Sequence, residues 1–172
     1  MRAGLNVDPI TNNRSITPEA RRVIEQLHQF VTRPEVRAGL LRTRAEADQK
    51  LQQDPDLPIA FVAFDPTQLG WSQSELVGSG RVVVTRNGGG DGIERHANST
   101  QYLFVLDGPV ETHVQTADGW HVDRYGYGDS AQLEDQWHVV APGTWHKSVA
   151  PGGRNWGIVA FHSAREVNDE YQ

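Results

Sequence analysis

The sequence predicts a mainly β protein in which a β-barrel follows two N-terminal α-helices. Between residues 17 and 53, apolar side chains recur at helical spacing, whereas beyond residue 58 short Val-rich segments alternate with turn residues. The chain has 172 residues, which is the size of one domain, and its 37% hydrophobic content is enough to form a core. We therefore expect one compact unit with helices packed outside a barrel.

Two helices are expected, at residues 17–33 and 35–53. Thr17 can cap the first helix, Pro18 suits its first position, and an acidic residue follows in the first turn. Pro34 ends this helix and can open the second one. The charges between the apolar positions of the second helix indicate a face in contact with water.

Short strand-like segments, separated by turns rich in Gly, Pro and Asp, make up most of the remaining chain. They are 59–64, 76–85, 94–98, 101–107, 110–116, 119–125, 137–141, 146–150 and 156–163. Strands of this length and frequency are typical of an all-β sandwich or barrel. A glycine run at 87–92 lacks the Lys-Ser/Thr pair of a phosphate-binding loop, so we interpret it as a turn. The expected organisation is a flexible arm at 1–16, a helical segment at 17–56, a barrel at 57–166 and a tail at 167–172.

Composition narrows the classes of function. The chain has no cysteine, which excludes disulfides and thiolate metal sites. Its net charge is −6 and it has no Lys/Arg cluster longer than a pair, so we expect no nucleic-acid partner. The sequence contains neither a long apolar run nor a signal peptide at its start, so we expect a cytoplasmic protein with no membrane association.

Four side chains have the spacing of a metal site. Glu94 and His96 are two residues apart and share one face of a strand, Gln101 begins the next strand, and His146 follows a Pro-Gly turn. One carboxylate, two imidazoles and an amide oxygen can bind one divalent metal ion and leave positions open. Two histidines with one carboxylate favour Fe(II), and Zn, Mn, Ni and Cu are the alternatives.

The same residues resemble the two motifs of the cupin superfamily. The first motif has His-x-His, four residues, Glu, six residues and Gly, and this spacing recurs here from Glu94 to Gly108, with Glu94 in place of the first His and Gln101 in place of the Glu. The second motif, Pro-x-Gly-x-x-His, is matched by Gly143 and His146. The resemblance covers about residues 75–165 and implies a double-stranded β-helix barrel that holds one metal ion. If Glu94 points away from the site, only two histidine ligands remain.

A shorter similarity links the chain to cupins that act as hydroxylaminobenzoate lyases. It consists of residues 95–98, 137–146 and 152–154 and places lyase chemistry high among the options. His162, at the end of an apolar run on the last expected strand, is a candidate general base or substrate hydrogen-bond donor. Glu94 is the second candidate catalytic residue, because a carboxylate that leaves the metal can carry a proton. The remaining histidines are interpreted as packed or surface residues.

These observations favour a metal-dependent cupin enzyme, an oxygenase or lyase of the non-haem Fe(II) type. Its substrate would be a small aromatic or oxygenated organic molecule bound inside the barrel. The alternatives are a metal-dependent cyclase or isomerase of a biosynthetic pathway, and a non-catalytic small-ligand-binding barrel. The resemblance also leads us to expect a homodimer.

Overall fold

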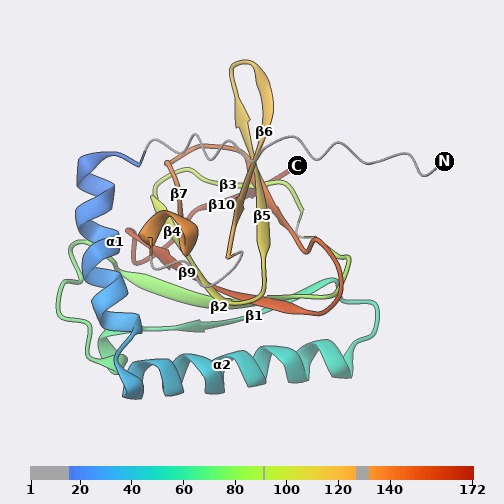
Figure 1. Ribbon diagram of the computed structural model, residues 1–172, viewed down its shortest axis with the longest axis horizontal. Coiled ribbons are helices and arrows are strands. Elements are labelled where there is room, and N and C mark those ends of the chain that lie inside the picture. Colours follow the sequence, from blue (N-terminus) through green and yellow to red (C-terminus); the bar gives the residue numbers. More distant parts are fainter. Residues whose placement is uncertain (1–15, 91, 127–131) are drawn as a thin grey trace.

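The computed structural model describes residues 16–90, 92–126 and 132–172. Within these ranges ten strands form two five-stranded antiparallel sheets, which pack face to face (Figure 1). The first sheet has the order β1 (Ile59–Phe64), β2 (Ser79–Thr85), β9 (Trp156–His162), β4 (Gln101–Asp107) and β7 (Trp137–Val140). The second sheet has the order β10 (Asp169–Tyr171), β3 (Glu94–His96), β8 (His146–Val149), β5 (Val110–Thr116) and β6 (Gly119–Tyr125).

Two helices precede the sheets in the described part of the chain, α1 (Pro18–Val31) and α2 (Pro34–Gln53), and both begin with proline as expected. The hydroxyl of Thr17 accepts a hydrogen bond from the backbone N–H of Ala20 at 3.1 Å, which caps α1. In Figure 1, α2 runs along β1 and β2, whereas α1 stands at one end of the first sheet. The helix prediction is confirmed to within two residues at each end.

The middle of the first sheet is buried on both faces, and the alternation of side chains along β4 shows how. Tyr102 and Phe104 pack with the apolar side of α1, in a cluster that also contains Leu27 and Phe161. Leu103 faces the other way and packs with residues of the second sheet. The layers are therefore helices, first sheet and second sheet, and the barrel interior lies between the two sheets.

The strand predictions hold with small changes at the ends. The expected strand at 76–85 begins only at Ser79, and the strand expected at 94–98 ends at His96. Two short 3₁₀ helices at Pro66–Leu69 and Leu133–Asp135 were not expected. The predicted arm at 1–16 falls, except for Ile16, outside the described residues.

The largest difference is β10, which forms within the segment interpreted as a tail. Its three residues pair antiparallel with β3, so that Asp169 lies opposite His96 and Tyr171 opposite Glu94. The segment Asp169–Tyr171 has two acidic residues and no apolar alternation, so it carries no local strand signal. Pairing with β3 places this C-terminal segment at the candidate site.

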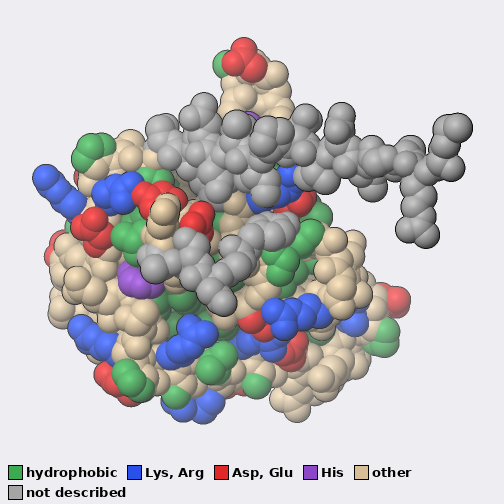
Figure 2. Space-filling model, viewed as in Figure 1, with side chains coloured by type: hydrophobic (Ala, Val, Ile, Leu, Met, Phe, Trp, Pro, Cys, Tyr) green, Lys and Arg blue, Asp and Glu red, His purple; other side chains and the backbone are tan. Residues whose placement is uncertain are grey.

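The surface is mixed in charge. On the face shown in Figure 2, Lys and Arg side chains are interspersed with Asp and Glu side chains. Among the described residues, no helix combines the length and the apolar content needed to cross a membrane.

Candidate metal centre

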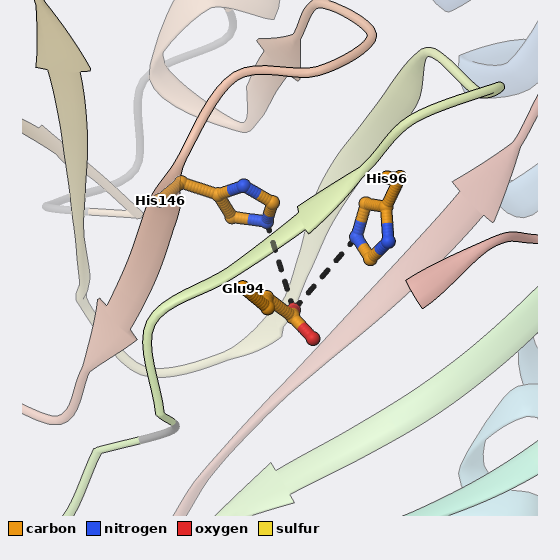
Figure 3. Close-up of side chains that lie close together, drawn as sticks. All are labelled: Glu94, His96 and His146. Atoms are coloured by element: carbon orange, nitrogen blue, oxygen red, sulfur yellow. Dashed lines mark ion pairs between the residues drawn. The ribbon is translucent and has the colours of Figure 1, made fainter. Parts of the chain in front are cut away.

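Three of the four proposed ligands meet inside the barrel. Glu94 and His96 come from β3, and His146, the first residue of β8, lies directly opposite Glu94. The Oε1 atom of Glu94 is 3.8 Å from Nε2 of His96 and 3.6 Å from Nε2 of His146. Figure 3 shows both imidazole rings directed toward the Glu94 carboxylate. This is the one group of three or more such side chains in the described ranges whose ligand atoms all lie within 4.8 Å of one another.

These distances fit a shared cation. A divalent ion bound at about 2.1 Å to two tetrahedrally placed ligands holds them about 3.4 Å apart, close to the separations between Glu94 and the two histidines. Both rings are almost fully buried, with exposed fractions of 2% for His96 and 1% for His146. The donor set and its spacing therefore suit a divalent metal ion, and side-chain shifts of a few tenths of an ångström would complete the geometry.

The second nitrogen of each imidazole is held by an acceptor, which determines the tautomer. Nδ1 of His96 lies 2.8 Å from Oδ1 of Asp169, and Nδ1 of His146 lies 3.0 Å from the carbonyl oxygen of Thr144. Since carboxylate and carbonyl oxygens only accept, both Nδ1 atoms carry the proton. Each Nε2 therefore presents a lone pair to the site, which is the state that a metal ion requires.

Electrostatics favour the same state. Burial lowers the pKa of His96, against the opposing charge of Glu94, and this keeps the ring neutral and able to bind metal. Burial works to raise the pKa of Asp169, but its hydrogen bond to Arg81 and the charge of that arginine lower it. Arg81 Nη2 is 2.8 Å from Oδ2 of Asp169, so the carboxylate stays ionised while it orients His96.

Gln101 lies beside these ligands. It is the first residue of β4, between His162 on β9 and Val140 on β7, and only 5% of it is exposed. Its amide nitrogen lies 3.0 Å from Nε2 of His96 and can donate to it. Its amide oxygen is buried and has no hydrogen-bond partner among the described residues. A turn of the amide would present that oxygen to a cation, so the residue can serve as a neutral ligand.

His162 is fully buried next to His96. Its ring stands perpendicular to that of His96 at a centroid distance of 4.7 Å. Neither ring nitrogen has a hydrogen-bond partner within the described parts of the chain. Burial, together with the neighbouring His96 and Arg81, lowers the pKa of His162 to about 3. A histidine of this pKa is neutral near pH 7 and a poor general base, which favours its other proposed role in hydrogen bonding.

The centre opens onto a cavity of about 130 Å³, whose wall includes Glu94 and Gln101. Leu103, Ile158 and Ala160 supply apolar surface, and Arg81, Ser148 and Tyr171 are its remaining polar or charged lining residues. The cavity thus combines an apolar wall with a few converging polar groups, as small-molecule sites do.

Sequence reasoning missed Asp169, which accepts a hydrogen bond from His96, and Arg81, which donates one to Asp169. Neither residue belongs to a motif, and Asp169 is 73 residues from His96 along the chain. The other histidines considered in the sequence, His113, His121 and His138, lie outside the three-ligand cluster.

Comparison with solved structures gives the fold independently. The chain is similar to a Lactobacillus farciminis oxalate decarboxylase in a formate complex, with 12% identity, a TM-score of 0.53, and coverage of 66% of this chain and 31% of that one. It is also similar to a recombinant oxalate oxidase in complex with glycolate, with 14% identity and a TM-score of 0.53. That match covers 66% of this chain and 55% of the oxidase. A third similar structure is peruvianin-I from Thevetia peruviana latex, described as a cysteine peptidase. Its sequence identity is 15%, its TM-score is 0.54, and the match covers 68% of each chain. No protein-family model matches the sequence, and a search of curated proteins found no match either.

These similarities confirm the cupin fold that the motifs suggested. The chain spans less than a third of the oxalate decarboxylase and about half of the oxalate oxidase. The fold does not select an activity, because one scaffold hosts many chemistries. This chain has no cysteine and so cannot provide the thiol that the description of peruvianin-I implies.

Proposed function

We propose that this cupin-fold protein is a metal-dependent enzyme, an oxygenase or lyase, acting on a small oxygenated or aromatic molecule. The observation that carries the proposal is the convergence of Glu94, His96 and His146 with both Nε2 lone pairs directed at one carboxylate. A divalent cation bound there supplies Lewis acidity to substrate oxygens, and Fe(II), which we favour, also supplies redox chemistry. Zn, Mn, Ni and Cu suit the same ligands.

Residues of the chain would then bind the metal, orient the substrate and exclude water. Glu94 is placed to hold the metal and, as the most accessible of the three ligands, to take up or release a proton at its carboxylate. Gln101 can orient a substrate through its amide N–H or bind the cation through its oxygen. The apolar wall of Leu103, Ile158 and Ala160 excludes water from the reacting groups.

Cavity size limits the substrate. A volume of about 130 Å³ accommodates a compact oxygenated molecule or the reactive end of a larger one. Two structural neighbours are described as oxalate enzymes, a decarboxylase and an oxidase, which supports lyase or oxidase chemistry on a compact oxygenated substrate.

A second candidate is a non-catalytic barrel that binds a small ligand. It is favoured by Gln101, an amide at the position where the cupin motif has a carboxylate ligand. A metal-dependent cyclase or isomerase uses the same metal chemistry as the first proposal, so substrate identification separates these activities.

Elemental analysis of the purified protein tests the proposal. We expect about one transition-metal ion per chain, and loss of that metal in both His96→Ala and His146→Ala. His113→Ala is the matched control, because His113 lies on β5 outside the ligand cluster. Full metal content in both His96→Ala and His146→Ala would show that the ligands are misassigned. A folded, metal-free wild-type protein would support the non-catalytic barrel.

A further inference from the structure

A second and larger cavity lies at the other end of the two sheets. It has a volume of about 460 Å³ and is lined from β6 and β7, the last strands in the order of each sheet, and from the start of α1. The metal-centre cavity instead reaches β1 and β10, the opposite edge strands. The two cavities share no lining residue among those that the structure describes.

One carboxylate in this cavity lies between two histidines. Asp123 on β6 has Oδ1 at 3.3 Å from Nε2 of His121 and Oδ2 at 3.6 Å from Nδ1 of His138 on β7. Asp123 and His138 are buried, whereas the side chain of His121 is about half exposed at 48%. Tyr125 stacks on the His138 ring at a centroid distance of 5.4 Å, which holds that ring in place. The two histidine rings flank Asp123, so its carboxylate has a fixed place on the wall of the cavity.

The cluster does not have the geometry of a second metal site. Over the described ranges, three ligand atoms come within 4.8 Å of one another only in the group formed by Glu94, His96 and His146. The volume of about 460 Å³ is instead that of a pocket for an organic molecule.

The lining determines the charge of the molecule that would fit. Two acidic residues, Glu19 and Asp123, line the cavity, and no lysine or arginine appears among its described lining residues. Burial raises the pKa of Tyr102 on the same wall, and the charge of Glu19 raises it further. Apolar contacts come from Val114, Val140 and neighbouring aliphatic side chains. An acidic end beside an apolar wall suits a cation with an apolar body.

We propose that this cavity is a second binding site, separate from the metal centre, for a small organic amine in its ammonium form. The ammonium group would donate hydrogen bonds to Asp123, and such charge-assisted hydrogen bonds are stronger than those between neutral groups. The apolar body would lie against Val114 and Val140, and the half-exposed His121 would contribute a polar contact at the entrance. A carboxylate ligand would instead face Glu19 and Asp123 and be repelled.

Three probes of nearly the same shape test the proposal: benzylammonium, benzyl alcohol and benzoate, titrated calorimetrically into the metal-loaded full chain at pH 7. We expect benzylammonium to bind at least tenfold more tightly than benzoate. Asp123→Asn should weaken benzylammonium at least tenfold and change benzyl alcohol little. Asp118→Asn is the control, since it makes the same charge change at an exposed position in the turn between β5 and β6.

A further arm distinguishes this cavity from the metal centre, where an amine can bind directly to a cation. Binding of benzylammonium should survive in His96→Ala, which removes a proposed metal ligand. Loss of binding in His96→Ala with retention in Asp123→Asn would place the amine at the metal and overturn the proposal. Benzoate binding as tightly as benzylammonium in His96→Ala, where a proposed metal ligand is removed, or no binding of benzylammonium at millimolar concentration, would overturn it as well. If Asp123→Asn does not fold, His121→Gln, at a half-exposed position, should still weaken benzylammonium about threefold.

Discussion

Asp169 shows how one residue outside the ligand set can determine what a ligand does. Its carboxylate accepts from Nδ1 of His96 at 2.8 Å, and Arg81 holds it from the other side at the same distance. The arrangement is a carboxylate–histidine pair of the kind that orients metal ligands and increases their basicity. Without it, the His96 ring could rotate or change tautomer, and Nε2 would no longer present its lone pair.

We therefore predict that Asp169→Ala lowers metal affinity about 10- to 100-fold, the usual effect of removing such a partner. Competition with a chelator of known affinity measures it. Glu170→Ala is the matched control, because Glu170 lies on the same strand but accepts from Nε of Arg95 at 2.8 Å. Equal affinities in the two variants would show that Asp169 does not orient a ligand.

Gln101 allows a second test at the scale of one residue. Gln101→Glu restores the carboxylate of the cupin motif and adds a negative charge near the cation, so we expect metal binding to be kept or tightened. Once a substrate is known, we expect lower turnover, because a more electron-rich metal is a poorer Lewis acid and the amide N–H donor is lost. Gln101→Ala should weaken metal binding only modestly.

Metal titration of the two variants beside His96→Ala checks this prediction. Metal binding should be lost only in His96→Ala. If Gln101→Glu fails to bind metal, the glutamine side chain does not face the cation, and the alignment of β4 with the cupin motif is off by one residue.

At the scale of elements, a side-chain hydrogen bond joins α1 to the first sheet. The indole N–H of Trp137 on β7 donates to Nδ1 of His28 on α1 at 3.3 Å, and Trp137 is fully buried. An indole N–H can only donate, so the bond requires Nδ1 of His28 to be unprotonated. Burial lowers the pKa of His28, in agreement with this contact.

This contact predicts a pH dependence of stability. Because the pKa of His28 is lower in the folded state, the unfolded state binds more protons as the pH falls below about 6.5, the ordinary histidine value. The stabilisation is thus complete above that pH and is lost as the pH falls toward the folded pKa. Urea unfolding at pH 7.5 and pH 5, followed by tryptophan fluorescence, should show a smaller drop in the free energy of unfolding for His28→Gln than for wild type.

The comparison between wild type and His28→Gln isolates the contribution of His28 to the pH dependence of stability. Burial also lowers the pKa values of His96, His113 and His162, and those three residues are unchanged in both proteins. An identical pH dependence in wild type and variant would show that His28 titrates equally in the folded and unfolded states.

At the scale of the whole molecule, apolar side chains are exposed at the β1–β10 end of the barrel. Phe61 is 50% exposed and Tyr171 66% exposed, and both are among the lining residues of the metal-centre cavity. Exposed aromatic groups gathered at one place are typical of interaction surfaces. Together with the cupin resemblance, they lead us to propose that two copies of the chain associate through this end.

The resulting prediction is that wild type sediments as a dimer and Phe61→Glu as a monomer. A charge at Phe61 would be buried in the dimer and hydrated in the monomer, which shifts the equilibrium toward the monomer. Trp120→Glu is the control, since Trp120 is similarly exposed at 43% but lies in the β5–β6 hairpin that projects from the barrel in Figure 1. A wild-type monomer independent of concentration would remove the dimer and leave the fold unaffected.

Local signals in the sequence were sufficient for the helices, for most strands and for the choice of candidate ligands. Thr17, Pro18 and Pro34 mark helix ends because caps and proline act within one turn. Glu94 and His96 share a face because side chains alternate along any strand. Periodicity and capping depend only on neighbouring residues, so they can be read without knowledge of the fold.

Other features were decided only by tertiary structure. Pairing of β10 with β3 brings Asp169 to His96 across 73 residues, and packing of the sheets removes His162 from water and lowers its pKa to about 3. The cavity beside Asp123 exists because β6 and β7 end their sheets at the same side of the barrel. Each depends on which distant segments pair and what they bury, and the free energy of those contacts is distributed over residues that no local pattern connects.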